Sequence, residues 1–351
     1  MVMMTESSVY LFKATNKEGS MSPKKVYQVA MIAAVLMLLV GWSVCQAADK
    51  ITIKAVSAWP KTTYETENFL KLLDLIKAKV DKEAPGQLEV QFLGGPEVIP
   101  NMEQVEAARK GLVDLVSTTA GYYLSVVPEA DSMTLSRIKS WEERAKGVND
   151  LMNEIHQKKI NCFYMGRIGT EIPFTVYLTK PIEKADFNDM SIRCAPTHVA
   201  ALKKLNAKPV VIPPTEVYTA LERGVVQGLI WPAGLIRDWG WDKVVNYTVD
   251  PGFYQGAMII LMNLDKWKKL PPNLQKIVLE AEDQAERLAD ERAQKRVKTD
   301  AEAMAKGGMK TIKLPDAEAK KLVDTAYSTL WEVVISKSPE YGPKLKDLVS
   351  K

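Results

Sequence analysis

Arg193 stands at the end of a short apolar run, followed at once by Cys194, Ala195 and Pro196. An arginine stays charged at any ordinary pH and presents a planar fork of donors that matches a carboxylate. If residues 191–194 form a strand, its end directs the guanidinium into the cleft beyond it. These residues are compatible with Arg193 binding a small organic acid, and equally with a surface arginine paired with an acidic neighbour such as Asp189.

Aromatic residues follow other predicted strand ends and loops. Trp231 lies in the apolar run that follows a glycine-ended helix, and Trp59, Tyr64, Tyr122 and Phe174 each follow a loop or strand-end signal. Each of these side chains could equally belong to the core. Together they predict an apolar pocket around one anionic group, which favours a monocarboxylate with an apolar or aromatic body over a polyanion.

The patterns of most enzyme classes are missing. The sequence has two histidines, no Gly-x-Ser-x-Gly turn, no His-x-x-x-His pair and no Gly-Lys-Ser/Thr after Gly94-Gly95. We predict no enzymatic activity and no cofactor. The 47 basic and 43 acidic residues leave a net charge of +4 and are scattered along the chain, which argues against nucleic acid as a partner.

The N-terminus resembles a secretory signal peptide. Lys24 and Lys25 precede an apolar run over residues 29–40, and small residues at Cys45 and Ala47 fit the specificity of a signal peptidase. The run is shorter than the ~20 residues that span a bilayer. We expect residues 1–47 to be removed and the protein to reach the periplasm; a retained anchor is the alternative.

Strand and helix patterns alternate along the rest of the chain. Strands are expected at 51–57, 88–93 and 112–117, with helices at 66–84 and 102–110, which is the order of a parallel sheet covered by helices. A helix at 141–158, strands at 160–165, 175–179, 191–194, 208–212 and 226–231, and helices at 198–205 and 217–223 follow. The strand at 258–262 should rejoin the first lobe. Residues 271–306 form the longest helical stretch, and 316–351 should add one or two helices.

The chain from about Ile51 to the C-terminus resembles the extracytoplasmic solute-binding proteins of TRAP transporters, the DctP-like family. The segments that carry the resemblance are 94–100, 111–115, 122–123, 192–193, 213–228, 250–254 and 263–267. It implies an α/β fold with two periplasmic-binding-protein-like lobes, each a mostly parallel sheet flanked by helices, a ligand cleft between the lobes and a long helix spanning both. Lobe I would comprise 49–171 and about 257–300, and lobe II 172–256 and about 301–351.

The resemblance also implies roles for particular residues. It makes Arg193 the main carboxylate contact, places the segment of Trp231 and Pro232 at the cleft, and adds Phe253 to the ligand-binding set. Gln227 stands where the family commonly has Asp. The carboxylates of the metal-dependent branches have no counterpart at Ile230-Trp231 or at residues 253–255, so we predict no metal ion.

The function that the resemblance implies is a periplasmic receptor that binds an organic acid and delivers it to TRAP membrane subunits. The protein would act as a monomer, with a dimer as the alternative. Other possibilities are a secreted sensor subunit of the same fold or a secreted hydrolase. Whether Cys162 and Cys194 form a disulfide stays open, because an oxidising compartment permits the bridge and a buried thiol is equally ordinary.

Overall fold

The computed structural model describes residues 50–170, 172–256 and 258–350, together with Lys24, Tyr27 and Met31. The predicted signal peptide and its cleavage site therefore lie outside the described residues, apart from those three positions. The folded unit spans Lys50–Lys351. Within the described residues, no helix combines the length and the apolar character needed to cross a membrane.

The first lobe is built on a five-stranded sheet with the strand order β2-β1-β3-β10-β4. Its strands are β1 (Ile51–Ser57), β2 (Leu88–Gly94), β3 (Leu115–Thr118), β4 (Cys162–Ile168) and β10 (Met258–Asn263). The first three strands pair in parallel as predicted, and β10 enters antiparallel between β3 and β4. All six residues of β10 are buried, which agrees with its continuous apolar sequence and its central position.

The second lobe is built on a six-stranded sheet with the order β11-β9-β5-β8-β6-β7. Its strands are β5 (Phe174–Leu178), β6 (Ser191–Cys194), β7 (Lys208–Val211), β8 (Gly228–Pro232), β9 (Tyr247–Asp250) and β11 (Lys310–Lys313). The sequence analysis missed β9 and β11. Both are four residues long, and β11 is a largely exposed edge strand rich in lysine, so neither has an apolar run. Cys162 in β4 and Cys194 in β6 belong to different sheets and are free, buried thiols.

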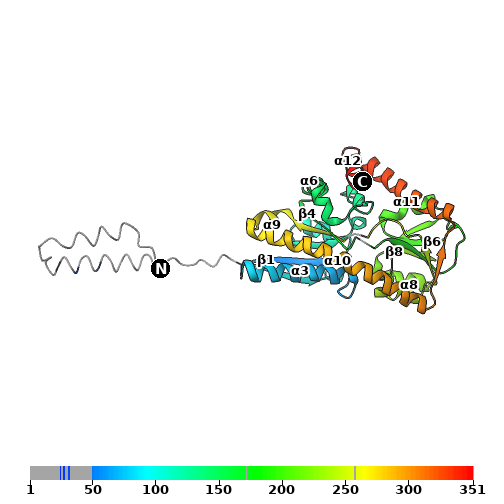
Figure 1. The fold of residues 1–351 in the computed structure, drawn as a ribbon, viewed down its shortest axis with the longest axis horizontal. Coiled ribbons are helices and arrows are strands. Elements are labelled where there is room, and N and C mark those ends of the chain that lie inside the picture. Colours follow the sequence, from blue (N-terminus) through cyan, green and yellow to red (C-terminus); the bar gives the residue numbers. More distant parts are fainter. Residues whose placement is uncertain are drawn as a thin grey trace. The chain divides into compact units, whose positions relative to one another are not determined.

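Helices cover both sheets (Figure 1). They are α3 (Tyr64–Glu83), α4 (Gln104–Arg109), α5 (Ser140–Ala145), α6 (Val148–Ile160), α7 (Val199–Lys204), α8 (Val217–Glu222), α9 (Leu264–Lys269), α10 (Pro272–Lys306), α11 (Asp316–Lys337) and α12 (Gly342–Val349). The single helix predicted over 141–158 was wrong. Gly147 adopts a left-handed conformation with φ of 77° and separates α5 from α6, because only glycine takes that conformation at little cost.

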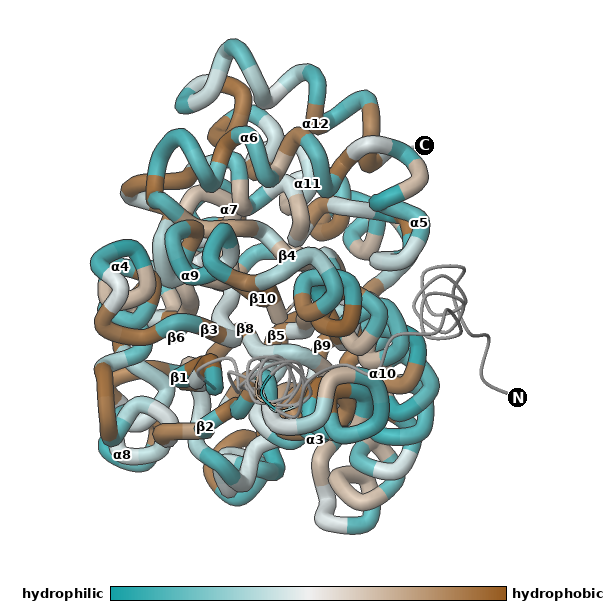
Figure 2. Tube along the Cα trace, turned by 90° about the vertical axis from the view of Figure 1, so that its left-hand side faces the viewer, coloured by the Kyte–Doolittle hydropathy of each residue, from teal (hydrophilic) through white to brown (hydrophobic). Residues whose placement is uncertain are grey.

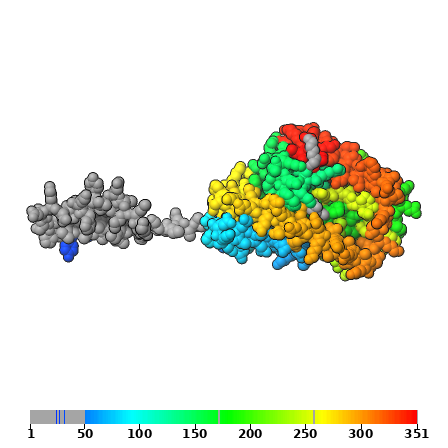
Figure 3. Space-filling view, viewed as in Figure 1, coloured from blue at the N-terminus to red at the C-terminus, as the bar shows by residue number. Residues whose placement is uncertain are grey.

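Helix α10 runs for 35 residues without an internal glycine or proline, as the sequence predicted. Its buried face carries alanines such as Ala281, Ala285 and Ala289, which allow close packing against α3 and β4, whereas its outward side is hydrophilic (Figure 2). Its C-terminal half contacts the segment after β8 through Asp300, which lies against Gly234. Helix α10 therefore touches both lobes, and it lies exposed as the orange segment across the face in Figure 3.

Candidate functional site

The second lobe presents its strand ends at one edge of the sheet. Strands β6 and β8 are parallel, so Arg193 near the end of β6 and Trp231 near the end of β8 lie close together. Strand β5 is antiparallel to β8, and its first residue, Phe174, pairs with Pro232. Ligands of open α/β sheets bind beyond the carboxyl ends of the parallel strands, which is where these four side chains gather.

The first lobe contributes its own strand ends to the same pocket. Trp59 follows β1 and Tyr122 follows β3, which is parallel to β1. Tyr64 opens α3, whose N-cap Thr63 accepts a hydrogen bond from the backbone N–H of Thr66. The cap fixes where the helix begins and therefore where Tyr64 points.

The two sets of strand ends enclose one pocket. The empty space between its lining atoms measures about 670 Å³, with its mouth included. The predicted site residues that line it are Trp59, Tyr64, Tyr122, Phe174, Arg193, Trp231 and Pro232. The remaining predicted residue, Phe253, does not line this pocket; it pairs with Phe174 through two backbone hydrogen bonds of 3.0 and 2.8 Å.

Arg193 is buried with one of its nitrogens unpaired. Its side chain is 1% exposed, and Nε and Nη2 both donate to the carbonyl of Ile212, at 3.1 and 3.0 Å. Nη1 has no hydrogen-bond partner. The guanidinium lies 5.1 Å from the centre of the Trp231 ring, and burial lowers the pKa of Arg193. Asp189, the alternative partner, instead lies 3.7 Å from Lys208 at the surface.

Another buried arginine shows the contrast. Arg167 in β4 is fully buried, and its Nε donates to Glu143 at 2.8 Å. Its other two nitrogens donate to the carbonyls of Met133 and Ile138. Arg167 is thus a satisfied structural residue, whereas Arg193 lines the pocket and keeps Nη1 without a partner.

Aromatic packing holds the walls in place. Trp231 contacts Trp241 edge-to-face, with 5.0 Å between ring centres, and Trp241 stacks on Trp239 at 5.1 Å. Phe174 packs edge-on against His198 at 4.9 Å. These contacts fix the ring planes that face the pocket.

The sequence analysis did not identify two polar residues of the pocket, His198 and Glu65. The sequence analysis placed His198 at the start of a helix over 198–205, whereas the structure buries it to 1% exposure. Burial, with Arg193 nearby, lowers the pKa of His198 to about 3, so the ring is neutral. Glu65 is 5% exposed, lines the pocket, and has no partner for Oε2. The sequence analysis began this helix at residue 66, after Glu65, and nothing in the local sequence indicates that Glu65 faces inward.

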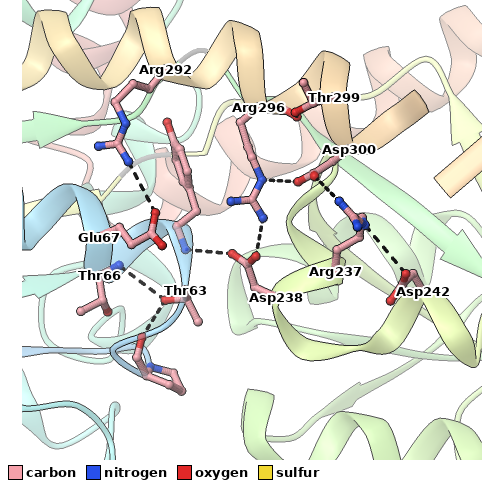
Figure 4. Close-up of polar contacts among 12 residues, drawn as sticks. Thr63, Thr66, Glu67, Arg237, Asp238, Asp242, Arg292, Arg296, Thr299 and Asp300 are labelled. Atoms are coloured by element: carbon pink, nitrogen blue, oxygen red, sulfur yellow. Dashed lines mark hydrogen bonds and ion pairs between the residues drawn. The ribbon is translucent and has the colours of Figure 1, made fainter. Parts of the chain in front are cut away.

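A polar network joins the lobes beside the pocket (Figure 4). Asp238, which follows β8, accepts a 2.8 Å hydrogen bond from the backbone N–H of Tyr64 at the start of α3. Arg296 of α10 donates to Asp238 and to Asp300, and Asp300 also accepts from Arg237 at 2.6 Å. One carboxylate of the second lobe thus contacts both the first lobe and the long helix.

We predicted that the cleft binds no metal ion, and the described residues bear on that prediction in two ways. Among the residues that the structure describes, no three His, Cys, Asp or Glu side chains converge so that they could hold a metal ion. Gln227, which stands where the family commonly has Asp, makes two local hydrogen bonds with its side chain. It accepts from the backbone N–H of Ser191 and donates to the carbonyl of Gly224, each at 2.8 Å, and so fixes the start of β6.

Comparison with known proteins gives concordant matches. The model of a family described as bacterial extracellular solute-binding protein, family 7 (DctP), matches residues 57–337. A monocarboxylate 2-oxoacid-binding periplasmic protein of Nostoc sp. is 21% identical over 275 residues, which make up 73% of this chain and 74% of that protein.

Solved structures share the fold. A TRAP periplasmic solute-binding protein from Desulfovibrio salexigens with bound orotic acid superposes with a TM-score of 0.75 at 18% identity, covering 86% of this chain and 98% of that one. A Bordetella pertussis extracytoplasmic solute receptor that binds pyroglutamic acid gives 0.74 at 20% identity, covering 86% and 99%. A TRAP solute-binding protein from Bordetella bronchiseptica, with calcium and picolinate in its site, gives 0.74 at 21% identity, covering 86% and 92%.

Proposed function

The chain belongs to family 7 of the bacterial extracellular solute-binding proteins, and from that premise we propose that it binds a monocarboxylate with an apolar or aromatic body. Members of this family are TRAP solute receptors that bind small organic acids. In the proposal, Arg193 binds the carboxylate, and Trp59, Tyr64, Tyr122, Phe174, Trp231 and Pro232 surround the rest of the ligand. Phe253 acts indirectly, by supporting Phe174.

The observation that carries the proposal is the unpaired Nη1 of Arg193. A buried donor without a partner costs free energy that a ligand acceptor can recover. A carboxylate supplies two acceptor oxygens and neutralises the buried charge. The lining is mostly apolar and aromatic, and it contains no second arginine, so a dianion would bury one charge without a partner.

The proposal includes delivery to a TRAP membrane transporter from the periplasm. The family is periplasmic, and the basic and apolar segments before residue 47 fit a cleaved signal peptide. Intact-mass analysis of the protein from its native host should show the loss of about 47 residues, the length set by the peptidase pattern. A full-length product embedded in the membrane would contradict secretion with cleavage.

A screen of organic acids tests the binding function. Protein without its first 47 residues is screened by thermal shift and then titrated calorimetrically, in EDTA throughout. We expect at least one apolar or aromatic monocarboxylate to bind without added metal. Binding only of phosphate esters or dicarboxylates, or binding that appears only after calcium is restored, would overturn the proposed ligand class.

A further inference from the structure

Glu65 is the buried ionisable group of the pocket that the proposed carboxylate leaves unexplained. It is the second residue of α3, its side chain is 5% exposed, and Oε2 is fully enclosed without a hydrogen-bond partner. The residue lines the same pocket as Arg193. An apolar monocarboxylate bound to Arg193 would leave this carboxyl buried and unpaired.

The unpaired polar atoms of the pocket divide between the lobes. The second lobe offers two donors, Nη1 of Arg193 and Nε1 of Trp231, and also Nδ1 of His198, which donates or accepts according to its tautomer, whereas the first lobe offers the acceptor Oε2 of Glu65. Tyr122 lines the same pocket; burial raises its pKa, and the charges of Arg193 and Glu65 shift it in opposite directions, the first lowering it and the second raising it. A ligand that satisfies both ends must carry an acceptor toward Arg193 and a donor toward Glu65.

We infer that Glu65 is a second ligand contact, which selects organic acids that also carry an N–H or ammonium group. This inference rests on the proposed function, because the carboxylate of the same ligand occupies Arg193. Both buried charges are then neutralised, because the carboxylate of the ligand pairs with Arg193 and its ammonium group pairs with Glu65. Such a ligand also bridges the lobes, because Glu65 comes from α3 and Arg193 from β6.

The charged surroundings of Glu65 support its use as a ligand contact. Burial is the main cause that raises the pKa of the Glu65 carboxyl to about 7. Of the groups that face it, Asp238 raises the pKa and Arg296 lowers it, and Tyr64 and Tyr122 are uncharged near that pH. An ammonium group requires the ionised carboxyl, so its binding should weaken as the pH falls from 8 to 6.

The test compares acids that differ only at the nitrogen. The probes are 4-(aminomethyl)benzoate against 4-ethylbenzoate, and proline against cyclopentanecarboxylate. They are titrated into the parent protein, Glu65→Gln and Glu67→Gln. Glu67 is the matched control because it lies in the same first turn of α3 but outside the pocket, 3.5 Å from Arg292. Thermal melting confirms that each variant is folded.

In at least one pair the nitrogen-bearing acid should bind the parent roughly tenfold or more tightly, which is the effect of a hydrogen bond to a charged group. Glu65→Gln should reduce that preference to below threefold and remove its dependence on pH between 6 and 8, whereas Glu67→Gln should keep both. The inference is overturned if carboxylates bind without a preference for the nitrogen acids, or if the preference survives in Glu65→Gln. If no carboxylic acid binds at all, the proposed function itself has failed.

Discussion

At the scale of single residues, the site is defined by polar atoms that the protein leaves unsatisfied. Most buried polar groups in proteins have partners, and Arg167 illustrates this with bonds to Glu143 and two carbonyls. Arg193 and Glu65 are exceptions to that rule, since each has an unpaired polar atom. They line the same pocket and come from opposite lobes. Their unpaired atoms indicate the two ends of a ligand more directly than the residue types do.

Removing the guanidinium should abolish most acid binding. Arg193→Ala leaves the ligand carboxylate buried without its partner, and truncating one member of such a pair costs ~2–5 kcal/mol. This corresponds to roughly a thirtyfold to several-thousandfold weaker affinity in calorimetric titration. Arg193→Lys should recover only part of it, because an ammonium cannot form two parallel bonds. An Arg193→Ala protein that binds within threefold of the parent would place the anchor elsewhere.

At the scale of elements, the pocket is a consequence of strand direction. Parallel strands such as β6 and β8 end at one edge, and an antiparallel neighbour such as β5 begins there. Helix α10 then contacts both lobes, and Arg296 holds Asp238 at the position where it accepts from Tyr64. The hydrogen bond between Asp238 and Tyr64 is thus a direct link between the lobes at a residue that lines the pocket.

The inter-lobe bond should contribute to ligand affinity because it can form only when the lobes are together. Asp238→Ala removes a hydrogen bond to a charged group, worth ~1.5–3 kcal/mol, so acids should bind roughly tenfold to a hundredfold more weakly. Asp242→Ala is the control, since its ion pair with Arg237, at 3.9 Å, joins two residues of the second lobe. Equal affinities for the two variants would show that the link plays no part in binding.

At the scale of the whole molecule, the pocket exists only while the lobes are in contact. Its walls come from two separate sheets, and Arg193 and Glu65 are both nearly fully buried in this arrangement. In two-lobed binding proteins a hinge motion separates such walls and admits the ligand. The contacts to both lobes then stabilise the closed arrangement.

Small-angle scattering should therefore detect closure. The radius of gyration of the parent should fall when a bound acid saturates it, and Arg193→Ala should show no change at the same acid concentration. A radius that is identical with and without ligand, under conditions where calorimetry shows saturation, would argue against a hinge motion.

The sequence alone determined the features that depend on neighbouring residues. Apolar runs and their breaks predicted β1 to β3, the return of β10 and the full extent of α10, because periodicity and helix-ending residues are local properties. Arg193 before a proline and the aromatic residues at strand ends were also visible, and seven of the eight predicted site residues line one pocket.

Only the tertiary structure decided how distant segments meet. The bond from Tyr64 to Asp238 joins residues 174 positions apart, and no local pattern specifies it. The same holds for Glu65, which precedes the predicted helix in the sequence and is buried in the folded chain. The backbone pairing of Phe253 with Phe174 likewise joins distant segments of the chain. Local sequence sets which residues stand at the strand ends. The burial of each polar atom, and its free energy, depend instead on contacts between the lobes, and these form only when the whole chain folds.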